Sequence, residues 1–259
     1  MHYPRRVPLF GFELDAVALD EAVARVYSWL REPGSACRYV VTPNVDHAVL
    51  YQRHAGLRAA YADASLVLAD GMPVVATARL LGRPIPERVT GTDLTVSLLA
   101  RADEFGGCRV FLLGASPEAA ARAAELIVAQ WPAVTVVGTN SPPRGFENDP
   151  AESERILDHI ERASPDLLVV GLGAPKQELW VHAHHQRIRA AVALCVGAAI
   201  DFLGGAKKRA PEWMQQYGLE WLHRLASEPR RLGPRYARDA WHLPGLVGRE
   251  LLQSRLRRW

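Results

Sequence analysis

The sequence predicts an α/β protein with a Rossmann-like, mostly parallel sheet covered by helices on both faces, followed by a basic helical appendage. Two observations predict the sheet: short runs rich in Val and Leu recur along the chain, and stretches with helical spacing separate them. Such alternation is typical of parallel sheets that are buried on both faces. A third observation, arginines gathered near the C-terminus, predicts the appendage. We expect an α/β domain over residues 1–205, with a small β/α unit at 1–36, and the appendage over 206–259.

The composition is that of a soluble globular protein with a sizeable core, because 49% of the 259 residues are hydrophobic and 23% are charged. Cys37, Cys108 and Cys195 lie far apart in or beside apolar stretches, so we expect buried, reduced thiols in a cytosolic protein. Residues 1–15 lack the apolar core of a signal peptide. The longest strongly apolar run, 190–200, is too short for a membrane span of ~20 residues.

The chain is expected to open with a small unit and then to alternate strands with helices. Residues 7–12 alternate like a short strand, residues 19–30 have helical spacing, and Pro33 and Gly34 end that helix. The expected strands that follow cover residues 39–41, 66–69, 109–113, 134–137, 167–170 and 192–196. The expected helices cover residues near 46–60, 73–81, 92–104, 117–130, 151–163 and 175–189.

The charge of the chain is unevenly distributed. Between Arg224 and Trp259 there are nine arginines and three acidic residues, a net charge of +6, although the whole chain carries only +3. A basic tail on a mildly acidic body indicates a polyanionic partner: a membrane surface, nucleic acid or phosphates.

The appendage combines arginines with aromatic residues. Pro211 and Pro229 predict helices that open at Glu212 and Arg230, because proline is tolerated in the first turn, and Gly218 precedes a third helix. The aromatic residues between the arginines are Trp213, Tyr217, Trp221 and Tyr236. Two interpretations stay open: a core helix with a solvated basic face, or an arginine cluster that binds a phosphate-bearing ligand.

Polar residues follow the expected strands, where ligands bind in open α/β sheets. Thr42 and Asn44 place a hydroxyl and an amide after the strand at 39–41. Asn44 or Asp46 could instead cap the next helix, and the pattern favours that role for Asp46. Asp70 ends a buried strand beside a glycine, where partial burial would set its pKa for work as a general base; Asp-Gly is also an ordinary turn dipeptide.

Further strand ends carry glycines and cations. Gly114 begins half of a dinucleotide fingerprint whose second and third glycines are missing, so the support for a nicotinamide cofactor is weak. Gly171 and Gly173 lie in a loop before a helix that carries Lys176, which is typical of an anion-binding helix terminus. Arg88 precedes two threonines at another helix start.

Several of these stretches resemble the WecG/TagA/CpsF glycosyltransferase family. They occur in the family's order over roughly residues 8–238, and the combination of PKQE, RAPEW and GLEWLHRL is highly specific. Gly233-Pro234 departs from the family, in which this region usually reads as an uninterrupted helix. The matching pieces are TPNVDH at 42–47, LADGMPVV at 68–75, RVTGTDL at 88–94, VFLLG at 110–114, RGF at 144–146, GLGAPKQELW at 171–180, GAAIDFLGG at 197–205 and RAPEWMQQYGLEWLHRLASEPRRL at 209–232.

The resemblance implies an inverting enzyme of cell-surface polysaccharide biosynthesis that needs no metal or other cofactor. Such enzymes move a sugar from a UDP-sugar to a polyprenyl-diphosphate-linked saccharide at the cytoplasmic face of the plasma membrane, to which this chain would bind peripherally. The sugar would be of the N-acetylmannosamine type, its uronic acid or a hexose. The sequence does not decide between these sugars, and it leaves a homo-oligomer open.

The resemblance also assigns roles to residues. Asp70 matches the general base, with Thr42 and Asn44 beside it. The residues expected on the side of the nucleotide sugar are Gly114, Gly171, Gly173, Lys176, Gln177, Glu178 and Arg88. Those expected to reach the acceptor diphosphate are Arg209, Arg224 and Arg231.

Two other classes of protein compete with this interpretation. A Rossmann-type oxidoreductase would share the sheet, but neither the fingerprint glycines nor a ribose-binding acid is convincingly placed. A non-catalytic basic module for nucleic acid or membranes would explain the tail but not the polar residues at the strand ends. We therefore expect no nucleic-acid partner.

Overall fold

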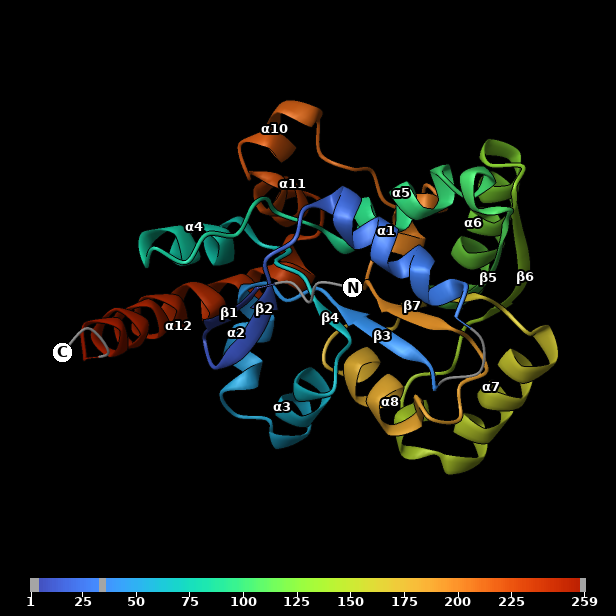
Figure 1. Cartoon of the computed structure of the whole chain (residues 1–259), viewed down its shortest axis with the longest axis horizontal. Helices are drawn as coiled ribbons and strands as arrows, with labels where there is room; N and C mark the ends of the chain where they lie inside the picture. The colour runs from blue at the N-terminus through green and yellow to red at the C-terminus, as the bar shows by residue number, and fades with distance from the viewer. Residues whose placement is uncertain (1–4, 33–35, 257–259) are drawn as a thin grey trace.

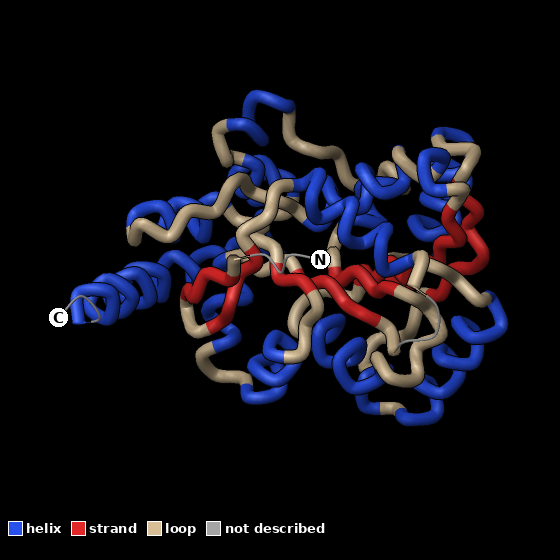
Figure 2. The backbone as a smooth tube through the Cα atoms, viewed as in Figure 1, coloured by secondary structure: helices blue, strands red, loops and turns tan. Residues whose placement is uncertain are grey.

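The computed structural model describes residues 5–32 and 36–256, and its centre is a six-stranded sheet (Figures 1 and 2). All neighbouring strands of this sheet run parallel. The order across the sheet is β4 (Leu66–Val67), β3 (Arg38–Val41), β8 (Val192–Cys195), β7 (Leu167–Gly171), β5 (Cys108–Gly114) and β6 (Val134–Asn140). The predicted α/β fold with a parallel sheet is therefore confirmed.

Helices cover both faces of the sheet, because successive strand residues point to opposite sides. Tyr39 and Val41 join the core of one face and Val40 the core of the other. The first face is packed against α2 (Val45–Tyr51), α3 (Ala55–Ala62), α7 (Pro150–Ala163) and α8 (Lys176–His184). The second face is packed against α1 (Leu19–Leu30), α5 (Gly91–Ala100), α6 (Pro117–Gln130) and α9 (Ala199–Leu203). Figure 1 shows these two layers below and above the strands.

Three predicted elements differ in detail from the structure. The single strand over 7–12 is a hairpin of β1 (Arg6–Leu9) and β2 (Phe12–Asp15), because Phe10 and Gly11 turn the chain with φ of 54° and 93°. The helix over 46–60 is split into α2 and α3, because the His54 Nδ1 accepts from the Leu57 N–H at 3.2 Å and caps a new helix. The helix over 92–104 stops at Ala100 and is followed by the 3-10 turn η1 (Asp103–Phe105).

Two further elements are shorter than predicted: the strand over 66–69 covers only Leu66–Val67, and the helix near 175–189 ends at His184. The remaining elements lie close to the predicted ranges, including α4 (Met72–Leu80). All three cysteines are buried and free, as expected. Residues 1–4, 33–35 and 257–259 lie outside the described part, and with them the helix break at Pro33 and Gly34 and the last two arginines of the basic tail.

The appendage consists of α10 (Glu212–Gln216), α11 (Glu220–Ser227) and α12 (Pro229–Leu256). The two starts marked by proline are confirmed, but Pro234 and Pro244 do not end α12. Leu232 and Leu246 of α12 are buried. No residue of α11 is fully buried.

Polar contacts fix α12 to the body near both of its ends. Near its start, Asp46 of α2 accepts from Arg235 and Arg238. Near its end, the buried Glu250 accepts from the Phe10 N–H at 2.7 Å and from Arg83 Nη1 at 2.6 Å. The helix therefore packs along the body and holds its inner face beside the carboxyl ends of the strands. Within residues 5–32 and 36–256, no helix has both the length and the apolar character to cross a membrane.

Candidate functional site

Two adjoining cavities lie between the carboxyl ends of the strands and the appendage. The larger, about 380 Å³, is here called the apolar cavity, and the smaller, about 200 Å³, the glycine-loop cavity. Residues from both the body and the appendage line both cavities, as expected for a ligand site at this edge of a parallel sheet. The residues common to the two cavities are Asn44, Asp70, Val196, Ala198, Arg224 and Arg235.

Asp70 lies where the two cavities meet. Its backbone N–H donates to the Pro43 carbonyl at 3.0 Å, which fixes the turn after β4. Burial raises the pKa of Asp70 to about 6, while Arg224 acts in the opposite direction. A carboxylate with such a pKa is ionised at pH 7 and is basic enough to accept a proton from a substrate hydroxyl.

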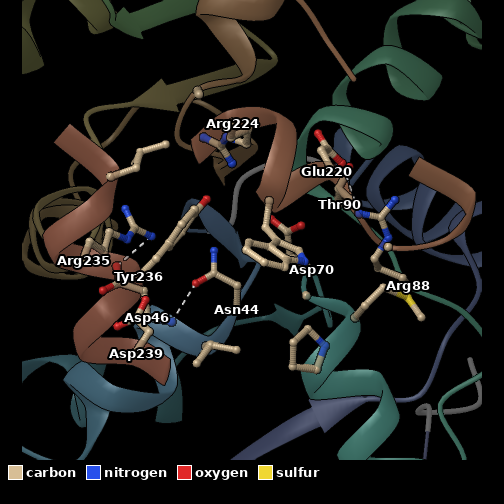
Figure 3. Close-up of a pocket in the computed structure, with 18 of the residues that line it drawn as sticks. Asn44, Asp46, Asp70, Arg88, Thr90, Glu220, Arg224, Arg235, Tyr236 and Asp239 are labelled. Carbon is tan, nitrogen blue, oxygen red and sulfur yellow. Dashed lines mark hydrogen bonds and ion pairs between the residues drawn. The ribbon is translucent and has the colours of Figure 1, made fainter. Parts of the chain in front are cut away.

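Asn44 lies beside Asp70 in the wall of both cavities (Figure 3). Its Oδ1 caps α2 by accepting from the backbone N–H of Asp46 at 3.0 Å and of His47 at 3.5 Å. Of the two caps that the sequence allows, Asn44 is confirmed. The prediction that Asp46 caps the helix is wrong, because Asp46 lies in the first turn and accepts from the arginines of α12. Thr42 is buried, lines the glycine-loop cavity and donates to the Cys195 carbonyl at 3.4 Å.

Gln177 holds together the two glycine loops that follow β7 and β8. Its Oε1 accepts from the N–H of Gly173 at 3.2 Å and of Gly197 at 3.1 Å. Gly171 is needed for the close approach of these loops, because a Cβ there would lie 2.8 Å from the Gly197 carbonyl oxygen. Gly171, Gly173 and Gln177 all line the glycine-loop cavity.

Three residues expected on the side of the nucleotide sugar line neither cavity. Gly114 ends β5 with φ of 117°, and a Cβ there would lie 2.6 Å from the Gly171 backbone, so it serves strand packing. Lys176 pairs with Glu147 at 2.7 Å. Glu178 is completely buried, and its Oε1 lies 3.3 Å from His47 Nε2.

The expected arginines occupy different places. Arg88 lines the apolar cavity and pairs with Glu220 of α11 at 3.2 Å, so it joins body and appendage. Arg209 pairs with Asp93 at 2.7 Å and lines neither cavity.

The remaining two expected arginines line cavities. Arg231 lines the glycine-loop cavity and pairs with Glu228. Arg224 lines both cavities, and its guanidinium lies 5.7 Å from the centroid of the Phe202 ring. Within the described residues, the side chain of Arg224 makes no hydrogen bond or ion pair.

Sequence reasoning missed the contribution of α12. Arg235 and Tyr236 of this helix point toward the apolar cavity in Figure 3, and Arg235 pairs with Asp46 at 2.8 Å. A helical period of three and four residues identifies the face. The residues of α12 that line the apolar cavity are Leu232, Arg235, Tyr236, Asp239, Ala240 and Leu243.

The two cavities differ in chemical character. The apolar cavity has aromatic and aliphatic walls that include Phe202, Trp221 and Tyr236. The glycine-loop cavity has glycine backbone, amides and cations that include Lys207 and Arg231. The second set suits an anionic group such as a diphosphate. Across the parts of the chain described, no three His, Cys, Asp or Glu side chains are arranged to hold a metal ion.

Comparisons with known proteins place this chain in a family. The sequence model of the "Glycosyl transferase WecG/TagA/CpsF family" matches residues 7–257. The chain is 32% identical over 193 residues to an N-acetylglucosaminyldiphosphoundecaprenol N-acetyl-beta-D-mannosaminyltransferase of Bacillus spizizenii, a match that covers 74% of this chain and 72% of the relative. It is 28% identical over 231 residues to a protein of the same name from Staphylococcus aureus, covering 88% of this chain and 87% of the relative.

The family match extends over both the body and the appendage. The cavities between them include residues from the stretches at 42–47, 68–75, 171–180 and 209–232 that carry the resemblance in the sequence. This chain is therefore a glycosyltransferase that belongs to the WecG/TagA/CpsF family.

Proposed function

We propose that this glycosyltransferase transfers an N-acetylmannosamine-type sugar, with inversion, from a UDP-sugar to a polyprenyl-diphosphate-linked saccharide. The observation that carries the proposal is the position of Asp70, a carboxylate with raised pKa at the meeting point of a cation-rich cavity and an apolar cavity. Both named relatives act on an N-acetylglucosaminyldiphosphoundecaprenol acceptor, which supports the acceptor class. In this proposal residues 1–205 form the catalytic domain and residues 206–259 complete its site.

The glycine-loop cavity is the proposed site of the donor diphosphate. Backbone N–H groups of glycine loops and nearby cations stabilise phosphate oxygens. Lys207, Arg224, Arg231 and Arg235 line this cavity. They offset the charge that develops on UDP as it leaves, which is the largest electrostatic demand of the reaction.

The apolar cavity is the proposed site of the acceptor. Its aromatic walls suit the faces of a sugar ring and the first part of a lipid chain. Arg224 and Arg235 line both cavities and can therefore also contact the acceptor diphosphate. Asp70 takes the proton from the attacking hydroxyl, and this oxygen then bonds to the anomeric carbon from the face opposite the departing diphosphate, which inverts that centre.

The test is a transfer assay with purified protein, a lipid-linked N-acetylglucosaminyl diphosphate acceptor, and UDP-N-acetylmannosamine, its uronic acid or a UDP-hexose as donor. We expect release of UDP together with a glycosylated lipid product for one of these donors. NAD reduction and nucleic-acid binding are measured in parallel. NAD reduction without sugar transfer from any donor would instead support an oxidoreductase.

Replacing Gln177, which lines the glycine-loop cavity, and Lys176, which does not, tests whether the donor diphosphate binds in this cavity. Gln177→Ala frees the N–H groups of Gly173 and Gly197, so the loops lose their common anchor. We expect UDP affinity to fall about tenfold, the equivalent of one hydrogen bond to a charged group. Lys176→Ala only breaks a pair with Glu147 and should leave the Kd for UDP within about twofold of the parent. Calorimetry measures both values; equal losses in the two variants would move the diphosphate site toward Lys176.

We further propose that the appendage binds peripherally to an anionic membrane at the cytoplasmic face. The +6 tail supports this, and so do the large apolar side chains that α12 exposes: Trp241 (82% exposed), Leu252 (64%) and Leu256 (76%). Arg249 lies among them and is also exposed. Exposed apolar and basic side chains together are typical of proteins that lie on a membrane surface.

The double variant Trp241→Ala/Arg249→Ala should reduce binding to vesicles that contain anionic lipid. Each Lys or Arg near such a surface contributes about 1 kcal/mol, so the loss of the charge alone is worth about fivefold. Binding of the parent should also weaken as salt rises, because screening shortens the reach of the charges. Co-sedimentation measures both effects. The exposed Arg122 of α6 provides the control: if Arg122→Ala loses as much binding as the double variant, α12 is not the membrane-binding element.

A further inference from the structure

A buried chain of hydrogen bonds joins two residues of the site, Asn44 and Gln177. The backbone N–H of Asn44 donates to His47 Nδ1 at 3.4 Å, and His47 Nε2 lies 3.3 Å from Glu178 Oε1. Glu178 Oε1 also accepts from Gln177 Nε2 at 2.7 Å. His47 is 6% exposed and Glu178 is completely buried. Asn44, His47 and Gln177 line the glycine-loop cavity, so the chain forms part of the wall of that cavity.

The donors and acceptors of this chain can be assigned from its fixed ends. Backbone N–H groups only donate, so the atom of Gln177 that contacts Gly173 and Gly197 is its oxygen, and its nitrogen must face Glu178. His47 Nδ1 accepts from the Asn44 backbone N–H, so the ring proton lies on Nε2 and is donated to Glu178 Oε1.

The other end of the chain fixes the direction of Asn44. Its oxygen accepts from the backbone N–H groups of Asp46 and His47 at the helix N-terminus, and its own backbone N–H donates to His47 Nδ1. The amide nitrogen is consequently left to face the cavity, as Figure 3 shows beside Asp70. Asn44 thus presents N–H donors to a ligand at the point where the base acts, whereas Gln177 sets the spacing of the glycine loops.

Stability alone does not account for the pair of His47 and Glu178. Burying polar groups costs desolvation free energy, which offsets most of what their hydrogen bond contributes. Glu178 Oε2 also has no hydrogen-bond partner among the described residues, nor does the hydroxyl of the neighbouring buried Tyr61. Buried polar groups without a hydrogen-bond partner cost free energy. This cost indicates that the arrangement serves the ligand site rather than the stability of the fold.

We propose that His47 and Glu178 are positioning residues that couple the wall carrying the general base to the donor loops. Glu178 acts through Gln177 on the glycine-loop cavity, and His47 acts through Asn44 on the space beside Asp70. The inference rests on the proposed function, because the spacing matters only if donor and acceptor meet at Asp70. It gives Glu178, which does not reach either cavity, a defined role in the transfer.

Glu178→Leu and Glu178→Gln test the proposal as a pair. The leucine variant removes the acceptor for both Gln177 and His47, so we expect UDP affinity to fall about tenfold and kcat to fall by about 10- to 100-fold. The glutamine variant keeps an acceptor oxygen at the position of Oε1 and should restore both values to within about threefold of the parent. A residue that only stabilises the fold would lower Tm in the leucine variant and leave UDP affinity and kcat of the folded fraction unchanged.

A double-mutant cycle identifies the route of the coupling. If Glu178 acts through Gln177, then Glu178→Leu/Gln177→Ala should bind UDP no more weakly than the worse single variant. Glu178→Leu combined with Lys176→Ala serves as the control pair and should show additive free energies. Additive effects for Glu178 and Gln177 would overturn the proposal. If Glu178→Leu does not fold, His47→Leu and His47→Gln replace it, with kcat and coupling to Asn44→Ala as the measurements.

Different experimental results would contradict the proposed function and this inference. A parent enzyme that neither binds UDP nor transfers sugar contradicts the function. A fully active parent whose Glu178→Leu variant keeps its UDP affinity and kcat contradicts the inference alone.

Discussion

Replacing Asp70 with asparagine should lower kcat by roughly 10²–10⁴. The substitution keeps the shape of the side chain and its place where the two cavities meet, but it removes the carboxylate that we propose as the base for the acceptor hydroxyl. Steady-state release of UDP and formation of the lipid-linked product both report the loss. KM for the donor should change little, because the contacts proposed for the diphosphate come from the glycine loops and the cations.

The pH dependence provides an independent readout of the same group. Burial raises the pKa of Asp70 to about 6, and the base works only when it is ionised. The rate of the parent should therefore rise with pH through about 6, and this acidic limb should be absent from the residual activity of Asp70→Asn.

A raised pKa in the folded state also means that the stability contributed by this group falls as the pH rises from about 4 to about 6. Asp70→Asn should consequently be at least as stable as the parent at pH 7.

A matched control separates the base from a general effect of removing a carboxylate. Asp20 is 96% exposed on its side chain and lies beside Arg101, away from both cavities. Asp20→Asn should retain the rate and the acidic limb of the parent. Near-normal turnover in a folded Asp70→Asn enzyme would rule out Asp70 as the general base.

The strand ends of the site were predictable from the sequence because their position depends on local patterns. Continuous Val and Leu runs identify buried parallel strands, and the carboxyl ends of such strands meet at one edge of the sheet. For that reason the sequence brings together Thr42, Asn44 and Asp70 with the glycine loop that carries Gly171 and Gly173. The roles of these residues in the reaction stay predictions.

The arginines were less predictable, because their partners lie far away in the sequence. Arg88 pairs with Glu220, and Arg209 pairs with Asp93. Lys176 similarly pairs with Glu147 of the 3-10 turn η2 (Phe146–Asn148) that follows β6. Composition shows that cations are present, but only tertiary structure decides which of them meet a carboxylate and which face a cavity.

Helix α12 shows how packing overrides a local signal. Pro234 and Pro244 each remove an intrahelical N–H donor and normally end or bend a helix. Here the buried Leu232 and Leu246, and the contacts of Asp46 and Glu250, keep the segment helical along the body. The residues that this helix contributes to the apolar cavity depend on that continuity. A prediction that ends the helix at Pro234 would therefore not place the residues after Pro234 at the cavity.

Replacing Arg224 with alanine should lower kcat/KM by roughly 10²–10³, the usual loss when one donor to a developing negative charge is removed. Arg231 and Arg235 both have carboxylate partners, Glu228 and Asp46. Arg224 lines both cavities without such a partner among the described residues, so its charge is available to a ligand. Its guanidinium is positioned against the Phe202 ring. Arg224→Lys should recover only part of the loss, because an ammonium group cannot form the paired contacts of a guanidinium fork.

The same variant should move the acidic limb of the pH–rate profile. Among the groups that lower the pKa of Asp70, Arg224 has the largest effect. Removing this positive charge disfavours the ionised carboxylate, so the pKa of Asp70 should rise and the limb should shift to higher pH. Arg230 of the same appendage is exposed and lines neither cavity, and Arg230→Ala should keep both the rate and the limb of the parent. If Arg224→Ala instead resembles Arg230→Ala in both measurements, Arg224 belongs to a solvated basic face and the leaving diphosphate must be stabilised by Lys207, Arg231 and Arg235.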